Sequence, residues 1–253
     1  MSLEFLISKI QKNNFLLIGR AGVDIYPDPP GTKTENTNKY VTHLGGSSAN
    51  MGVQLTKYGG SCSLLTRVSN DALGKFAINQ LDSYGVKSDL VKLEDNESRI
   101  SFAIVESTVV DHQSIIYRHK AADLFLNKND IDNSNLRNYE CILITGTSLA
   151  AEPSRSAVLY ALKLAKEKKI PVIMDIDYRP YTWESEDKAK QIYNLAGDYC
   201  SGIIGNDDEF AILSGNYDDG LSYAKKISRN CDLVIYKMGE KGSITFANNE
   251  EIP

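Results

Sequence analysis

Five groups of polar or glycine residues in this 253-residue chain each follow a stretch that is predicted to be a strand. In chain order they are Asp24; Gly45, Gly46 and Asn50; Asp175, Asp177 and Arg179; Asn206 and Glu209; and Lys237, Gly239 and Gly242. A single polar residue after a strand is usually a turn former or a helix cap. Five such groups at one end of one sheet instead indicate a ligand crevice, because ligands of open α/β folds bind at the carboxyl ends of the strands.

Apolar strands that alternate with amphipathic helices must position these groups. Strands are predicted at 15–19, 63–68, 141–145, 171–175, 202–205 and 233–237, and a further one begins at 243. Helices are predicted at 49–58, 71–84, 154–168, 188–196, 208–213 and 221–227. This alternation predicts an α/β fold with a doubly wound, mostly parallel sheet that helices cover on both faces.

The alternation breaks at two places. Residues 39–43 predict a short edge strand after the turn-rich stretch DPPGTKTENTN, and 101–106 with 114–118 predict a hairpin around Asp111 and His112. A small sheet at the ligand end of the main sheet would act as a lid, so we expect a β-sheet lid built from segments near 24–43 and 98–120. Exposed strand edges in such a lid favour pairing with a second subunit, which predicts a homodimer.

Charge and composition exclude several functions. The formal net charge is −5, so the chain has no excess of lysine or arginine with which to bind a nucleic acid or a membrane surface. The four cysteines are far apart and form no CxxC pair, which favours buried thiols in a reducing compartment. No apolar run is long enough to span a bilayer, and the N-terminus lacks a signal-peptide core. We therefore expect a cytoplasmic protein with no nucleic acid and no membrane as partner.

The order of several motifs resembles that of the ribokinase-like (PfkB) family of carbohydrate kinases, over nearly the whole chain. The matching stretches are GRAGVD, LGGSSANMGVQLTKYGG, TRVSNDALGKF, NDDEF and YKMGEKG. GRAGVD is not a dinucleotide fingerprint, because the GxGxxG spacing is missing. The resemblance implies a ribokinase-like fold and a sugar kinase that uses ATP and Mg²⁺.

Carried onto this sequence, the family pattern implies a site for a small sugar. The Asp24 carboxylate would accept hydrogen bonds from sugar hydroxyl groups, and Asn50 would offer both sides of its amide. Gly45 and Gly46 would let the backbone approach the sugar closely, with a tight turn as the alternative explanation.

The same pattern implies a nucleotide site further along the chain. Lys237 would meet a phosphate as a point charge, and Gly239 and Gly242 would leave room for the nucleotide. Asn206 and Glu209 resemble an NxxE element that organises Mg²⁺ near the phosphates, and Glu209 would hold the ion mostly through water. The alternative for Glu209 is an exposed residue in the first turn of a helix, where the macrodipole favours an acid.

Two stretches bear on the choice of sugar. IDYRPYTWE and IIYRHKAAD most resemble kinases of 5-dehydro-2-deoxygluconate in inositol breakdown, and next kinases of 2-keto-3-deoxygluconate. Arg179 and Arg118 stand in these stretches, and a planar, two-pronged guanidinium suits a substrate carboxylate. The alternatives are a lid–core contact for Arg118 and a surface salt bridge for Arg179. A fructokinase-like kinase of a neutral sugar also stays open.

One element of the family pattern has no counterpart in the sequence. The pattern includes a Gly-Ala-Gly-Asp element, whose aspartate takes the proton from the attacking hydroxyl and whose helix start stabilises the transferred phosphate. Nothing up to Pro253 matches it, so we expect 1–253 to be one domain without its C-terminal part, and the base beyond Pro253. Such a chain would transfer phosphate poorly. An inactive sugar-binding or regulatory protein is the alternative of another class.

Overall fold

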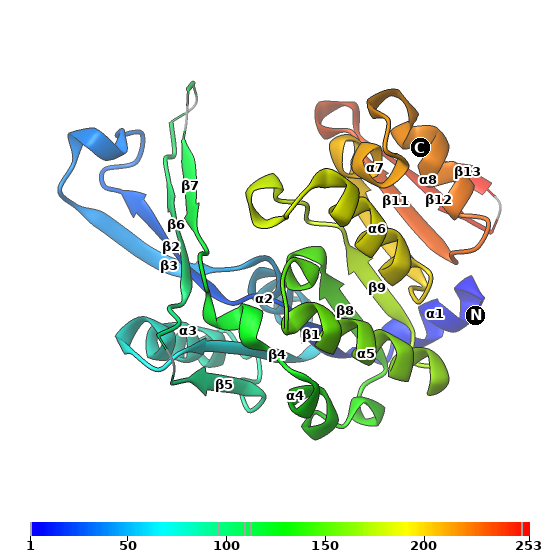
Figure 1. Cartoon of the computed structure of the whole chain (residues 1–253), viewed down its shortest axis with the longest axis horizontal. Helices are drawn as coiled ribbons and strands as arrows, with labels where there is room; N and C mark the ends of the chain where they lie inside the picture. Colours follow the sequence, from blue (N-terminus) through cyan, green and yellow to red (C-terminus); the bar gives the residue numbers. More distant parts are fainter. Residues whose placement is uncertain (1, 96, 109, 112, 249) are drawn as a thin grey trace.

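The computed structural model describes residues 2–95, 97–108, 110–111, 113–248 and 250–253. His112, which we placed in the turn of the predicted hairpin, lies outside the described residues. In the described part of the chain, two β-sheets and eight α-helices make up the fold (Figure 1).

The main sheet has nine strands in the order β13-β12-β11-β10-β9-β8-β1-β4-β5, counted over the described residues. Neighbouring strands run parallel except at one edge, where β12 is antiparallel to β11 and to β13. The strands are β1 (Asn14–Ile18), β4 (Ser61–Ser69), β5 (Val91–Glu94), β8 (Cys141–Thr145), β9 (Val172–Asp175), β10 (Gly202–Asn206), β11 (Leu233–Lys237), β12 (Ser243–Ala247) and β13 (Glu250–Ile252). The predicted mostly parallel α/β sheet is confirmed.

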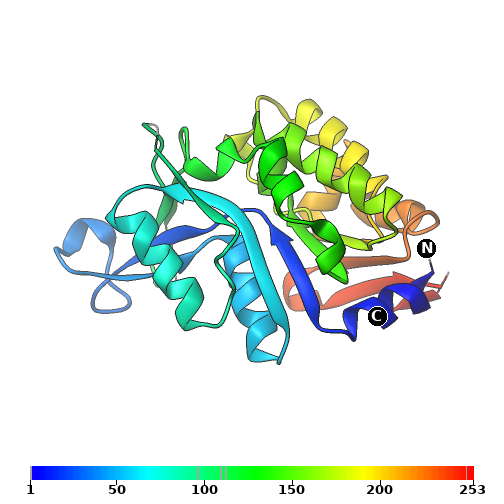
Figure 2. The same ribbon diagram turned by 90° about the horizontal axis from the view of Figure 1, so that it is seen from below.

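Helices lie on both faces of this sheet (Figure 2). They are α1 (Leu3–Ile10), α2 (Ser47–Lys57), α3 (Ala72–Ser83), α4 (Lys128–Asn133), α5 (Ser154–Glu167), α6 (Glu186–Gly197), α7 (Asp207–Ser214) and α8 (Gly220–Ile227). Side chains alternate across a strand, so β1 contributes to two cores. Leu16 and Ile18 belong to a core shared with α5 and α6, and Phe15 and Leu17 belong to one shared with α2 and α3. A continuous apolar run therefore suits a strand that is buried on both faces.

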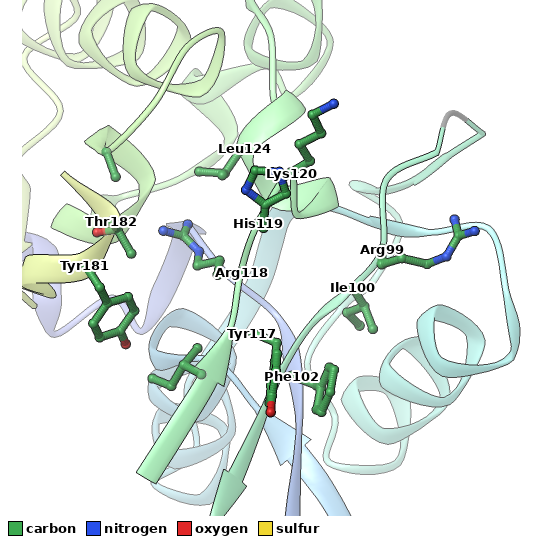
Figure 3. Close-up of a pocket in the computed structure, with 12 residues that line it drawn as sticks. Arg99, Ile100, Phe102, Tyr117, Arg118, His119, Lys120, Leu124, Tyr181 and Thr182 are labelled. Carbon is green, nitrogen blue, oxygen red and sulfur yellow. The ribbon is translucent and has the colours of Figure 1, made fainter. Parts of the chain in front are cut away.

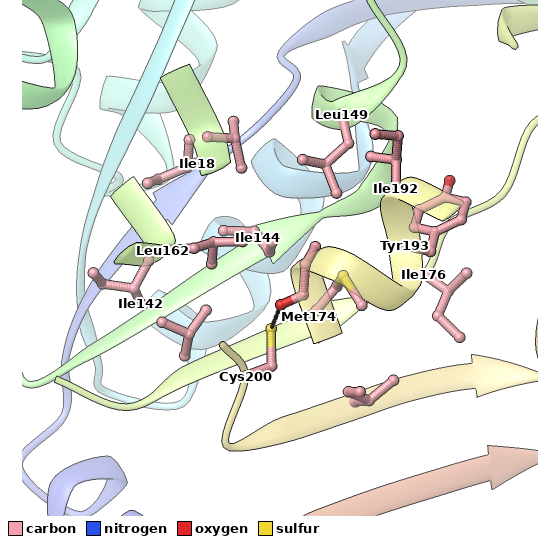
Figure 4. Close-up of a cluster of buried hydrophobic side chains, with 14 of the residues drawn as sticks. Ile18, Ile142, Ile144, Leu149, Leu162, Met174, Ile176, Ile192, Tyr193 and Cys200 are labelled. Atoms are coloured by element: carbon pink, nitrogen blue, oxygen red, sulfur yellow. Dashed lines mark hydrogen bonds between the residues drawn. The ribbon is translucent and has the colours of Figure 1, made fainter. Parts of the chain in front are cut away.

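The larger core lies between the sheet and helices α5, α6 and α8. Figure 4 shows Ile144 of β8 and Met174 of β9 in this core together with Leu162 of α5 and Ile192 of α6. The buried positions of α5 recur every three or four residues, which is the period that predicted this helix.

A second sheet of four strands projects from the main one, in the order β3-β2-β6-β7 (Figure 1). Its strands are β2 (Gly22–Pro27), β3 (Tyr40–Gly45), β6 (Ser101–Val105) and β7 (Ser114–Tyr117). β2 is antiparallel to β3 and parallel to β6, and β6 and β7 form the predicted hairpin. This sheet is the predicted lid.

Asp24 lies in the lid, as the predicted lid segment 24–43 implies, but it lies in a strand that the sequence did not show. It is part of β2, opposite His43 of β3 and Ala103 of β6. This strand forms because β3 and β6 pair with it from later parts of the chain, and no local pattern announces such pairing.

Several elements were not predicted, namely α1, α4, β5 and β13. α4 begins at a capping box, in which the Asn127 side chain accepts from the backbone of Asp130 and the Asp130 side chain accepts from the backbone of Asn127. Of the described helices, none has both the length and the hydropathy that crossing a membrane requires.

Candidate active site

A cavity of about 530 Å³ opens where the lid meets the main sheet (Figure 3). It is lined by Arg99, Ile100, Phe102, Ile116, Tyr117, Arg118, His119, Lys120, Leu124, Ala150, Tyr181 and Thr182. Among the described residues its lining includes three side chains with a positive charge, one histidine and no carboxylate. Figure 3 shows the charged ends of Arg99 and Lys120 pointing away from Arg118, so Arg118 is the cation of this lining that an anionic ligand would meet.

Arg118 follows β7 and is the buried cation of this cavity, with 8% of its surface exposed. In Figure 3 its side chain points toward Tyr181 and Thr182. One terminal nitrogen donates to the Asp123 carboxylate and to the backbone oxygen of Thr147, at 3.0 Å from the latter. The other terminal nitrogen and Nε have no hydrogen-bond partner among the described residues. Arg118 therefore makes the lid–core contact that we gave as the alternative to a ligand-binding role. Its two nitrogens without a partner also leave N–H donors for a ligand.

Arg179 follows β9 and pairs with a protein carboxylate. Its terminal nitrogen lies 2.8 Å from Oδ1 of Asp177, and the other donates to the backbone oxygen of Tyr178 at 2.9 Å. The Arg179 side chain is 42% exposed, whereas that of Asp177 is only 5% exposed. Asp177 has a positive φ of 41°. A non-glycine residue in this region of backbone space is strained, and such strain is concentrated at functional sites.

The Asp24 side chain lies against Gly45, and Gly46 follows as the N-cap of α2. A Cβ atom on Gly45 would come within 2.1 Å of Oδ1 of Asp24, so the glycine leaves the space that this carboxylate occupies. Asn50 is exposed in the first turn of α2, where its backbone N–H donates to the Gly46 oxygen at 2.9 Å. Burial raises the pKa of the Asp24 carboxyl, and the charges of Arg20 and His43 oppose the shift.

The predicted nucleotide residues gather at the carboxyl ends of three adjacent parallel strands. Asn206 at the end of β10 lies opposite Lys237 at the end of β11, and Asp175 at the end of β9 lies opposite Ile204 of β10. Nζ of Lys237 is 3.8 Å from Oδ1 of Asp175. Burial raises the pKa of Asp175 to about 6; the neighbouring carboxylates add to this shift, and Lys237 opposes it.

Glu209 is a buried helix cap. Its two carboxylate oxygens accept from the backbone N–H groups of Asn206 at 2.8 Å and of Tyr178 at 3.1 Å. In return the Asn206 side chain accepts from the backbone N–H of Glu209, which completes a capping box at the start of α7. The alternative that we gave for Glu209, an exposed first-turn residue, is wrong, because the residue is 6% exposed.

The residues at this edge fit a loosely held Mg²⁺ and do not fit a closed cage. The described part of the chain contains no group of three or more His, Cys, Asp or Glu residues arranged to hold a metal ion. Asp175 and Glu209 are close enough for the charge of Glu209 to raise the pKa of Asp175. Mg²⁺ usually keeps several waters and takes one or two carboxylates plus phosphate oxygens, which agrees with this sparse donor set.

Gly239 and Gly242 form the turn between β11 and β12. Both have a positive φ, of 57° and 86°, and a Cβ atom on either would meet no described atom within 4 Å. The turn is closed by a 2.8 Å hydrogen bond from the Met238 N–H to the Gly242 oxygen. Space beside this turn is therefore open to solvent or to a ligand.

Sequence reasoning missed Arg20, Asp123 and Tyr181. Burial raises the pKa of the Tyr181 phenol, and three nearby guanidiniums oppose the shift, those of Arg179, Arg20 and Arg118. The charges of the predicted residues Arg118 and Arg179 thus both act on Tyr181. Of these two arginines, only Arg118 lines the cavity. A signal for Arg20 was present, since it stands in the GRAGVD stretch that we singled out.

The fold is an α/β sheet with a second, lid-like sheet and a cavity of small-molecule size between them, and comparison with known proteins identifies its family. A family model described as pfkB family carbohydrate kinase matches residues 12–253. The chain belongs to this family.

Relatives and solved structures agree with this assignment. A 5-dehydro-2-deoxygluconokinase of Geobacillus kaustophilus is 33% identical over 243 residues, which are 94% of this chain and 72% of that protein. The structure of a 2-dehydro-3-deoxygluconokinase of Thermotoga maritima is similar with a TM-score of 0.83 at 20% identity, covering 94% of this chain and 78% of that one. A fructokinase double mutant of Vibrio cholerae, solved with fructose, ADP and potassium ion bound, has a TM-score of 0.79 at 22% identity, covering 95% and 75%. The two structures show a shared fold.

Proposed function

We propose that this carbohydrate kinase transfers a phosphoryl group from ATP to a hydroxyl of a keto- or acid sugar, with 5-dehydro-2-deoxygluconate as the first substrate to test. The observation that carries the proposal is the basic cavity at the base of the lid, in which buried Arg118 keeps two nitrogen atoms without a partner among the described residues. The 33% identity to a 5-dehydro-2-deoxygluconokinase supports the same substrate. A kinase of that acid would act in inositol catabolism in the cytoplasm.

In this proposal the two ends of the sugar are held differently. Asp24 accepts hydrogen bonds from hydroxyl groups, while Arg118 donates to the carboxylate end. Gly45 leaves the space that the Asp24 carboxylate occupies, so the hydroxyl-binding group lies directly at the start of α2. Binding both ends orients the acceptor hydroxyl, and orientation is a large part of catalysis in phosphoryl transfer.

The nucleotide end is assigned to the edge formed by β9, β10 and β11. Lys237 meets a phosphate, Asn206 shapes the start of α7, and the turn at Gly239 and Gly242 leaves room for the nucleotide. When bound, Mg²⁺ would neutralise phosphate charge, and Asp175 and Glu209 would hold it through water.

The test measures binding and turnover separately. Calorimetric titration gives the Kd values of 5-dehydro-2-deoxygluconate, 2-keto-3-deoxygluconate and fructose, and a coupled assay follows ADP formation with ATP and Mg²⁺. We expect the tightest binding with 5-dehydro-2-deoxygluconate, and sugar-dependent ADP formation in a form of the protein that carries a Gly-Ala-Gly-Asp element. Tighter binding of fructose would show that the substrate is a neutral sugar and not an acid sugar. Sugar binding with no ADP formation by a form that carries the Gly-Ala-Gly-Asp element would instead favour an inactive sugar-binding or regulatory protein.

The lid also supports the proposed homodimer. Its edge strands are β3 and β7, and both present exposed apolar side chains, namely Tyr40, Val41, Ile115 and Tyr117. An exposed apolar strand edge readily pairs with another chain. Light scattering should give twice the chain mass, and an Ile115→Lys variant should shift the protein to the monomer mass. A monomer mass for the unaltered protein contradicts the dimer.

A further inference from the structure

The charges of three arginines act on the phenol of Tyr181, and only two of these arginines have a carboxylate partner in the described structure. Arg118 forms a buried ion pair with Asp123, and Arg179, whose side chain is 42% exposed, forms an ion pair with Asp177. Arg20 has no carboxylate of the described residues within 4 Å. The two arginines that the sequence singled out are therefore already neutralised, and the third is not.

The Arg20 side chain is buried, with 9% of its surface exposed, and the carboxylates of Asp123, Asp177 and Asp24 act on its charge only from beyond salt-bridge distance. A terminal nitrogen donates to Oγ of Ser101 at 3.3 Å, and Nε has no hydrogen-bond partner among the described residues. Burial lowers the pKa of Arg20, and the charge of Arg118 acts in the same direction. A buried charge without a partner is unfavourable, and an anionic ligand would remove the penalty.

The backbone holds Arg20 at the junction of the lid and α2. Its carbonyl oxygen accepts from the N–H of Ala49 at 3.2 Å, and Gly46 packs so closely that a Cβ atom there would come within 2.4 Å of the same oxygen. This places a rigid backbone under the side chain. A group held in this way recognises its ligand at a low entropic cost.

Arg20 also lies beside the proposed sugar site, because its hydrogen-bond partner Ser101 stands between Ile100 and Phe102, which line the cavity. The charges that act on it belong to Arg118, Asp123 and Asp177 at the acid end and, most weakly, to Asp24 at the hydroxyl end. Tyr181, which lines the cavity, lies within reach of the Arg20 charge. An extended acid sugar with its hydroxyl groups at Asp24 would therefore pass Arg20 on its way to Arg118.

We infer that Arg20 is the specificity-determining residue that neutralises the carboxylate of an acid sugar, while Arg118 contributes hydrogen bonds through its free donors. The inference rests on the proposed function, because it assumes that the ligand is an acid sugar. Arg179 then acts at a distance, by holding Asp177 in place.

The test compares a charged ligand with its neutral form. Binding of 5-dehydro-2-deoxygluconate and of its methyl ester is measured by calorimetry for the unaltered protein, Arg20→Met, Arg20→Lys and Arg118→Met. Arg137→Met, a loss of an exposed arginine between α4 and β8, is the control for net charge. We expect Arg20→Met to weaken binding of the acid by at least ~30-fold and of the ester by less than ~3-fold. Arg20→Lys should keep part of the preference for the acid, and Arg137→Met should keep all of it.

Failure of this inference and failure of the proposed function give different results. If the unaltered protein binds acid and ester equally, the acid-sugar proposal itself is wrong. If it prefers the acid, and Arg20→Met keeps that preference while Arg118→Met loses it, the role of Arg20 is overturned and the function stands. Equal weakening of both ligands by Arg20→Met also overturns the role, since it indicates a structural effect. Should Arg20→Met fail to fold, as judged by circular dichroism, the Arg20→Lys ratio decides: an acid-to-ester preference unchanged from that of the unaltered protein overturns the role.

Discussion

Asp177 accepts a hydrogen bond from the hydroxyl group of Ser47, with 2.6 Å between its Oδ2 and the serine Oγ. Ser47 is the first residue of α2, and Asp177 follows β9, 130 positions later in the chain. The same carboxylate accepts from Thr147 Oγ1 at 3.3 Å and pairs with Arg179. One buried side chain therefore joins three segments that surround the proposed sugar site.

Removing the charge of Asp177 should loosen this junction. We expect Asp177→Asn to lower the free energy of unfolding by about 1–3 kcal/mol, because a buried hydrogen-bond acceptor is replaced in part by a donor. Urea unfolding measures the change, and Asp187→Asn on the exposed start of α6 is the control. A double-mutant cycle with Ser47→Ala should show coupling between the two residues. Strictly additive effects would show that the 2.6 Å contact contributes nothing.

Asp175 predicts a pH dependence of stability. Its pKa in the folded protein is about 6, raised chiefly by burial, and a free aspartate titrates near 4. The carboxyl therefore favours the folded state fully below about pH 4, and this contribution is lost as the pH rises through about 6. We expect Asp175→Asn to gain roughly 2–3 kcal/mol over the unaltered protein at pH 7.5 and almost nothing near pH 4.

Urea unfolding of both proteins between pH 4 and pH 8 checks this prediction. Lys237→Met should enlarge the effect, because the Lys237 charge holds the pKa of Asp175 down. A difference between Asp175→Asn and the unaltered protein that does not change with pH would contradict the prediction.

Gly46 and Gly31 form a matched pair for testing whether the lack of a Cβ atom at Gly46 is required by its neighbours. Both have a positive φ, of 98° and 86°, but a Cβ atom on Gly46 would lie 2.4 Å from the Arg20 oxygen, whereas one on Gly31 would meet no described atom within 4 Å. We expect Gly31→Ala to destabilise by about 1–2 kcal/mol through backbone strain alone. Gly46→Ala should cost at least ~3 kcal/mol and should weaken sugar binding, because the start of α2 must move away from Arg20. Equal thermal shifts for the two variants would show that the clash is relieved without cost.

The cap at the start of α7 can be separated from the proposed Mg²⁺ role. Glu209→Gln places an amide N–H₂ against backbone donors, so we expect a loss of about 1–3 kcal/mol in stability. Asp208→Asn, the exposed neighbour in the same first turn, should lose less than ~0.5 kcal/mol. If Glu209 also reaches Mg²⁺ through water, Glu209→Gln should reduce the Mg²⁺ dependence of ATP binding, whereas Asp208→Asn should leave it unchanged. If the Mg²⁺ dependence of ATP binding is unaltered in Glu209→Gln, Glu209 acts only as a helix cap and does not help to hold Mg²⁺.

Local patterns in the sequence were enough to predict the main sheet. β8 and β11 have the predicted bounds, because an apolar run of five residues between turn formers suits a strand buried on both faces. α5 was predicted from its own spacing of apolar residues, and the polar ends of β9, β10 and β11 lie at one edge because parallel neighbours end together. The family followed from the order of short motifs, which the family model confirms.

Only the tertiary structure decided what these residues contact. β2 is a strand because β3 and β6 pair with it, and this pairing places Asp24 opposite His43 and Ala103 within the lid. Arg118 and Arg179 each have a carboxylate close by in sequence, but which arginine would be paired depends on where the chain folds back. Arg20 is buried beside Ser101, 81 positions away, through packing of the lid against α2. Burial and ion pairing depend on such long-range contacts, and no local period in the sequence encodes them.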